Sequence, residues 1–143
     1  RNAKDYKSQL LEIDEDFSLF LNTLEKKKKY LVSCEGAFSY LAEDYGLKEA
    51  YLWPVNAESQ ITPKRMSRVI NLVKANDIPA VFCESTVSSE SQLTVVRETG
   101  TKFGGNFYVD SLSEAEGPAS SYLELLNHNL NLIKKAFKDH STN

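Results

Sequence analysis

The chain has 143 residues, a net charge of −3 and two cysteines. This length fits one domain with a substantial core, and the acidic balance gives no electrostatic footprint for nucleic acid. No apolar run approaches the roughly 20 residues that a membrane span needs. There is no CxxC motif and no Cys/His cluster, so a structural zinc site is not expected.

The first half of the chain predicts two helices, each followed by a strand. Apolar residues recur at steps of three and four in the helical stretches and form short continuous runs in the strands. Gly46 is expected to cap the second helix. The basic block Lys26–Lys29 is interpreted as a solvated helix end rather than a surface for lipids or polyanions. The predicted elements are a helix over 2–25, a strand over 29–33, a helix over 37–45 and a strand over 50–53.

The second half continues the alternation. Thr62 and Pro63 suit the N-cap and the first position of a helix, and Ser89-x-x-Gln92 has the pattern of a capping box. The predicted elements are a helix over 63–76, a strand over 78–82, a helix over 89–99, a strand over 103–109 and a helix over 118–138. The whole pattern predicts an α/β fold: a four-stranded parallel sheet with helices on both faces, preceded by a long helix.

Three predicted strands run into an acid that a small residue follows. These pairs are Glu35-Gly36, Glu84-Ser85 and Asp110-Ser111. Parallel strands end at one edge of a sheet, where ligands bind in open α/β folds. Converging carboxylates repel unless a cation joins them, and their oxygens suit manganese, magnesium, calcium or ferrous iron. Glu35 is the first candidate ligand, Asp110 the second, and Glu84 and Ser111 are candidate supporting residues; each acid could instead be a solvated strand end or a helix cap.

Cys34 and Cys83 each precede a strand-end glutamate, so the two could lie side by side on neighbouring strands. The residues alone leave two readings open, a disulfide or two small buried thiols. Of the two histidines, His128 falls in the middle of the last predicted helix and His140 in the tail after it, both away from the strand ends. No Ser/His/Asp or Cys/His catalytic arrangement follows from this pattern.

The segment Ser33-Cys34-Glu35-Gly36-Ala37-Phe38-Ser39-Tyr40-Leu41, with Tyr45-Gly46 after it, resembles the SEGAF-x-Y…YG segment of metal-binding solute-binding proteins of ABC importers. The similarity is to the manganese/iron branch, and most of all to its cyanobacterial manganese-binding members. It covers nearly the whole chain. Further matching segments are Ala50–Trp53, Asn56–Glu58, Thr62-Pro63, Ile78–Ser85 and Val109–Leu112.

The resemblance implies two lobes joined by a long helix, with one metal ion buried between them. Residues 1–28 would be the end of the inter-lobe helix, and residues 29–143 the C-terminal metal-binding lobe. Glu35 and Asp110 fall on that lobe's two ligand positions. The other two ligands are histidines of an N-terminal lobe that has no counterpart here. Some relatives pair their cysteines, which favours a disulfide between Cys34 and Cys83.

Zinc-binding relatives carry histidine where Glu35 stands, so the resemblance favours Mn2+ or Fe2+ over Zn2+. We therefore predict the C-terminal half of an extracytoplasmic solute-binding protein, not an enzyme. It would capture the metal between two lobes and deliver it to an ABC membrane permease. Its place would be the periplasm or, as a lipoprotein, the outer face of the cytoplasmic membrane. The alternatives are a Mg2+-dependent phosphoryl-transfer domain that uses the strand-end carboxylates, and a structural domain without a ligand.

Overall fold

A computed structural model describes residues 3–36, 38–54, 61–108 and 122–141 of the chain. Helices and short strands alternate along it, as the sequence predicts. The elements are α1 (Ala3–Leu21), the 3-10 turn η1 (Lys26–Lys28), β1 (Tyr30–Glu35), α2 (Ser39–Tyr45), β2 (Lys48–Trp53), α3 (Pro63–Asn76), β3 (Ala80–Glu84), α4 (Glu90–Thr99), β4 (Lys102–Phe107) and α5 (Tyr122–Ser141).

The strands lie in the order β2-β1-β3-β4. Backbone pairing joins β1 to β2 and β3 to β4, both in parallel. β1 lies beside β3, because the Cα atoms of Cys34 and Cys83 are 4.8 Å apart, the spacing of neighbouring strands. Within the described residues, no backbone ladder is assigned between β1 and β3. The predicted four-stranded sheet is therefore two two-stranded parallel sheets lying edge to edge, joined through side chains of β1 and β3.

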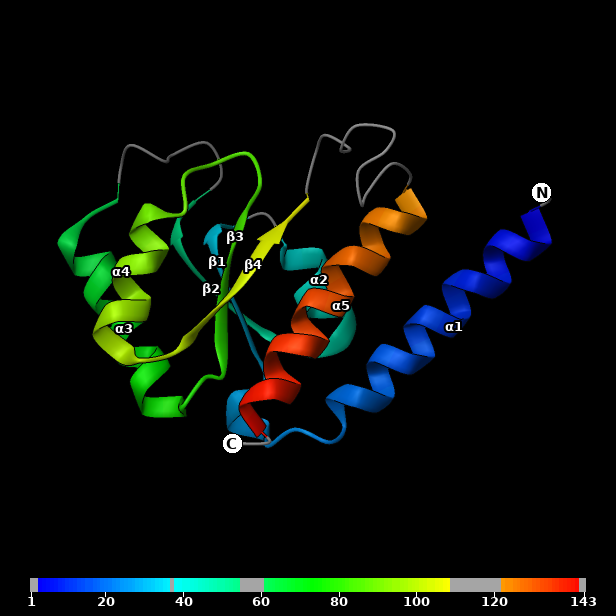
Figure 1. Cartoon of the computed structure of the whole chain (residues 1–143), viewed down its shortest axis with the longest axis horizontal. Coiled ribbons are helices and arrows are strands. Elements are labelled where there is room, and N and C mark those ends of the chain that lie inside the picture. Colours follow the sequence, from blue (N-terminus) through cyan, green and yellow to red (C-terminus); the bar gives the residue numbers. More distant parts are fainter. Residues whose placement is uncertain (1–2, 37, 55–60, 109–121, 142–143) are drawn as a thin grey trace.

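Helices cover both faces of the strands, with α3 and α4 on one side and α2 and α5 on the other (Figure 1). α1 lies outside α5 and diverges from it toward the amino terminus (Figure 1). Alternation along the strands feeds two apolar cores. Leu31 and Phe82 belong to the core on the side of α1, α2 and α5, and Val32 and Val81 belong to the core under α3 and α4.

Several local signals act as predicted. The Thr62 hydroxyl accepts a hydrogen bond from the Arg65 N–H at 3.1 Å, which caps α3. Gly46 and Gly100 end α2 and α4 with φ of 69° and 77°, a left-handed conformation that glycine adopts without strain. The C-cap prediction at Gly46 is confirmed.

The capping box at Ser89 is wrong. The Ser89 side chain makes no capping hydrogen bond. Gln92 instead faces the strands, is fully buried, and donates a hydrogen bond to the Phe82 carbonyl at 2.6 Å. Val95 is the buried apolar residue of α4, because it lies on the same inward face as Gln92.

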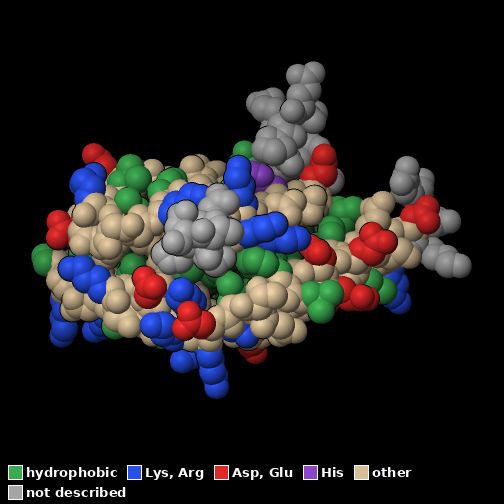
Figure 2. All heavy atoms as spheres, turned by 60° about the horizontal axis from the view of Figure 1, so that its bottom comes forward, with side chains coloured by type: hydrophobic (Ala, Val, Ile, Leu, Met, Phe, Trp, Pro, Cys, Tyr) green, Lys and Arg blue, Asp and Glu red, His purple; other side chains and the backbone are tan. Residues whose placement is uncertain are grey.

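Several predicted boundaries also move. α1 ends at Leu21, and the lysine block forms η1 instead of a helix end. Lys28 pairs with Glu25 at 3.5 Å and with Asp77 at 3.6 Å, and the surface in Figure 2 intersperses basic with acidic side chains. β1 and β3 reach further than predicted and include their final glutamates. Among the described helices, none is long and apolar enough to cross a membrane.

Candidate metal-binding site

Glu35 is the last residue of β1, where it pairs with Trp53 of β2 and is half-buried. Its backbone is held on both sides. The Ser33 hydroxyl donates to the Glu35 carbonyl at 2.9 Å, and the next N–H, that of Gly36, donates to the Trp53 carbonyl at 3.1 Å. A Cβ at Gly36 would lie 2.8 Å from the Tyr51 ring, so glycine lets the chain pass this ring directly after the candidate ligand.

Glu84 is the last residue of β3 and is fully buried. Its Oε1 accepts a hydrogen bond from the Glu35 N–H at 3.0 Å. Its Oε2 is buried and has no hydrogen-bond partner among the described residues. The pKa of the Glu84 carboxyl is raised to about 7, mainly by burial; the hydrogen bond from the Glu35 N–H opposes the rise, and the nearby charge of Glu35 adds to it. The structure thus brings Glu84 against Glu35, as the shared strand edge predicts.

Cys34 and Cys83 form the disulfide that the family resemblance favours, and it links β1 to β3 one residue before the two glutamates. The two sulfur atoms and a Glu84 carboxylate oxygen lie within 4.8 Å of one another. Metals bind thiolates, and sulfur atoms joined in a disulfide are not thiolates. The disulfide therefore fixes the strand ends and does not itself offer a metal site.

Asp110 and Ser111 lie outside the described residues. The described residue that precedes them is Tyr108, just beyond the end of β4. The buried Asn129 of α5 holds this point: its Oδ1 accepts from the Tyr108 N–H at 3.0 Å, and its Nδ2 donates to the Tyr108 carbonyl at 2.9 Å. Two hydrogen bonds to one backbone residue replace a neighbouring strand there.

The placement of His128 away from the strand ends is wrong. Its Nε2 lies 3.3 Å from the Asn106 carbonyl oxygen, and its ring centroid is 4.7 Å from that of Tyr108. The reason is that α5 packs against β4, which brings its first turns to the carboxyl end of that strand. Sequence reasoning missed both His128 and Asn129 as residues of this edge, because the run Asn127–Asn129 carries no signal of what it faces.

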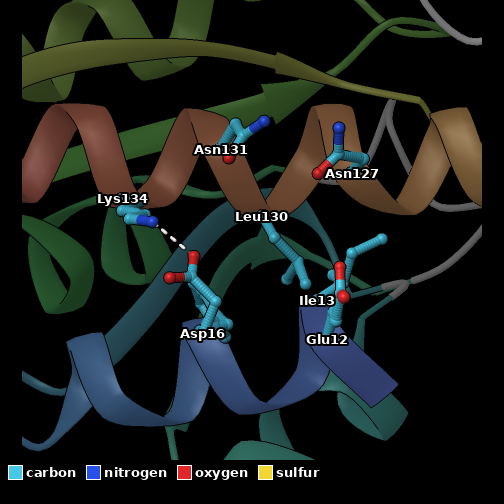
Figure 3. A pocket seen from close by; sticks show the side chains of 8 residues that line it. Glu12, Ile13, Asp16, Asn127, Leu130, Asn131 and Lys134 are labelled. Carbon is cyan, nitrogen blue, oxygen red and sulfur yellow. Dashed lines mark hydrogen bonds and ion pairs between the residues drawn. The ribbon is translucent and has the colours of Figure 1, made fainter. Parts of the chain in front are cut away.

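A groove of about 210 Å³ opens between α1 and α5 (Figure 3). Lys134 of α5 forms an ion pair with Asp16 of α1 at one end of it. None of the residues predicted for the site lines this groove. The full lining comprises Glu12, Ile13, Asp16, Phe17, Asn127, Leu130, Asn131 and Lys134.

Comparison with known proteins identifies the group to which this fold belongs. The family model described as zinc-uptake complex component A, periplasmic, matches residues 1–136. The iron-binding protein YfeA of Yersinia pestis is 44% identical over 137 residues, covering 96% of this chain and 44% of the relative. The manganese-binding lipoprotein MntA of Halalkalibacterium halodurans is 32% identical over 129 residues, covering 90% of this chain and 43% of the relative.

Solved structures agree. A manganese-bound periplasmic metal-binding protein from Candidatus Liberibacter asiaticus superimposes with a TM-score of 0.84 at 36% identity, covering 94% of this chain and 50% of that one. The periplasmic zinc-binding protein TroA of Treponema pallidum shares the fold, with a TM-score of 0.80 at 22% identity. The chain thus spans about half the length of the relatives it matches.

The relatives include a manganese ABC transporter substrate-binding lipoprotein of Streptococcus anginosus, and the solved structures are named as periplasmic metal-binding proteins. A family of solute-binding proteins for transport is not a family of enzymes, and the phosphoryl-transfer alternative has no support. The resemblance that the SEGAF-like segment indicated is confirmed: the chain belongs to the ZnuA family of metal-binding solute-binding proteins of ABC importers.

Proposed function

We propose that residues 29–143 form the C-terminal lobe of a protein that captures Mn2+, or Fe2+, outside the cytoplasm and delivers it to an ABC permease. Residues 1–28 would be the end of the helix that joins this lobe to an N-terminal one. Glu35 and Asp110 would supply two carboxylate ligands, and the N-terminal lobe two histidines. The periplasm, or a lipid anchor on the outer face of the cytoplasmic membrane, is the proposed location.

The observation that carries this proposal is the position of Glu35. It is a half-buried carboxylate at the carboxyl end of a strand. The glycine after it lets the chain pass close to the Tyr51 ring, and a second glutamate, Glu84, accepts a hydrogen bond from its backbone N–H. Carboxylate oxygens are hard donors and suit Mn2+ and Fe2+. Soft ligands would instead select copper or zinc. Relatives named for binding manganese and iron support the same metals.

The test is Mn2+ titration of the whole protein that carries this chain, with Glu35→Gln and Asp110→Asn as variants. Each substitution removes one negative ligand, so each should weaken Mn2+ binding by more than the roughly 10- to 100-fold expected for a residue outside the coordination sphere. Glu98→Gln is the matched control, since Glu98 is an exposed acid on α4. Wild-type protein that binds no Mn2+, Fe2+ or Zn2+, or variants that bind as tightly as it does, would contradict the proposal.

A further inference from the structure

The junction between β1 and β3 is where the described strands lack a backbone ladder, and the candidate ligand Glu35 stands at this junction. The Glu35 N–H points across this junction and donates a hydrogen bond to a side-chain oxygen, Oε1 of Glu84, at 3.0 Å. In a regular ladder the acceptor would be a backbone carbonyl of the neighbouring strand. A ladder would hold the backbone in place whatever the side chains were. Here the hydrogen bond of the Glu35 N–H depends on the length and chemistry of residue 84.

Burying Glu84 at this position costs desolvation free energy. It is fully buried, and its second oxygen has no hydrogen-bond partner among the described residues. Burying a carboxylate without satisfying it is unfavourable, and a neutral acceptor of the same length would make the same contact at lower cost. The buried Glu84 carboxyl therefore calls for an explanation beyond packing, and its hydrogen bond from the Glu35 N–H supplies one.

Two further contacts hold the strands close to Glu35. The Cys34–Cys83 disulfide fixes the strands one residue earlier, so the two glutamates are the first residues beyond that covalent tie. On the opposite side β2 holds the chain through the Trp53 carbonyl, which accepts from Gly36 and not from Glu35. The Glu84 contact is thus the described hydrogen bond that fixes the N–H of the ligand residue itself.

We propose that Glu84 is a positioning residue for metal capture: its carboxylate holds the backbone of Glu35 so that the Glu35 side chain meets the ion in a fixed orientation. A hydrogen bond to an oxygen held in a fixed place restricts the movement of the Glu35 backbone before the ion arrives. The inference rests on the proposed function, because it presumes that Glu35 is a ligand.

Two substitutions of Glu84 distinguish a role in positioning Glu35 from a role of the Glu84 charge. Glu84→Asp keeps the charge but is one methylene shorter, so its carboxylate cannot reach the Glu35 N–H from the same backbone. Glu84→Gln keeps the length and an acceptor oxygen but loses the charge. If Glu84 acts by positioning, Mn2+ affinity should fall roughly 10- to 100-fold in Glu84→Asp, and Glu84→Gln should recover most of that loss.

The measurement is Mn2+ titration of the whole protein, together with the electron paramagnetic resonance spectrum of the bound ion, which reports the symmetry of its ligands. Gln92→Leu is the matched control, because Gln92 is also buried and bonds to β3, at Phe82, but does not touch Glu35. It should lower thermal stability and leave Mn2+ affinity and the spectrum as in the wild type.

Three results would overturn the inference: Glu84→Asp binding like the wild type, Glu84→Gln losing more affinity than Glu84→Asp, or Gln92→Leu losing affinity as much as Glu84→Asp. Failure of the proposed function gives a different pattern, since wild-type protein would then fail to bind or Glu35→Gln would bind normally. A Glu84→Asp protein that does not fold leaves Glu84→Gln to decide, because a positioning role predicts that this variant keeps the wild-type spectrum and a role through charge predicts that it does not.

Discussion

Replacing Glu84 with glutamine should make the metal-free protein more stable at neutral pH and leave it almost unchanged near pH 4.5. The side chain is fully buried and the pKa of its carboxyl is raised from 4.5 to about 7. In the folded protein the carboxyl therefore keeps its proton up to about pH 7, whereas in the unfolded chain it loses the proton near pH 4.5.

The direction in which the free energy of unfolding changes with pH follows from proton linkage. Between these two pKa values the folded state binds more protons than the unfolded state, so the free energy of unfolding falls as the pH rises. A difference of about 2.5 pKa units corresponds to about 3 kcal/mol, lost across that window and constant above it. This is opposite to the behaviour of a carboxylate whose pKa is lowered by a salt bridge.

The assay is urea unfolding of wild-type and Glu84→Gln protein at several pH values from 4.5 to 8, with a chelator present to keep the site free of metal. The difference between the two proteins isolates Glu84 from the other titrating groups. It should grow in favour of Glu84→Gln by about 3 kcal/mol between pH 4.5 and pH 7.5. A difference that stays constant over this range would refute the reasoning, since it would mean that Glu84 titrates alike in both states.

Two further predictions concern the same edge. Replacing Cys34 and Cys83 together by serine should lower the free energy of unfolding by about 4 kcal/mol, because the disulfide closes a loop between residues separated by 49 positions. Denaturant unfolding with and without a reductant measures this loss. A loss below about 1 kcal/mol would count against loop closure as the cause. Gly36→Ala should cost about 1–3 kcal/mol, because the new methyl group meets the Tyr51 ring, and Tyr51→Leu should relieve part of this cost; a double-mutant cycle with no coupling between the two would show that the contact is not the cause.

Local sequence patterns were sufficient for the alternation of helices and strands and for the ends of several helices. The caps at Thr62, Gly46 and Gly100 are hydrogen bonds to the adjoining helical turn. A short window of sequence therefore contains both partners of each bond. The strand-end glutamates could be placed at one edge because parallel strands share an edge whatever their order.

The contacts that complete the edge could not be read in this way. Glu84 reaches Glu35 across 49 positions of sequence, and Asn129 reaches Tyr108 across 21. Gln92 matched a capping pattern and yet turns inward, because the Phe82 carbonyl offers its amide a buried partner. A polar side chain that bonds to backbone in another element leaves no periodic signal, so three-dimensional packing decides its role.

The strand order itself explains why the candidate site lies where it does. β1 and β3 are central neighbours, and the chain leaves them toward opposite faces: α2, after β1, packs with α1 and α5, and α4, after β3, packs with α3. In open α/β folds the two connections diverge at such a point and leave room for a ligand at the carboxyl edge. Glu35 and Glu84 end these two strands, and Asp110 follows β4, the next strand along. Because the candidate site lies at this edge and the outer faces of α3 and α4 do not reach it, substitutions on those faces should alter stability without altering metal affinity.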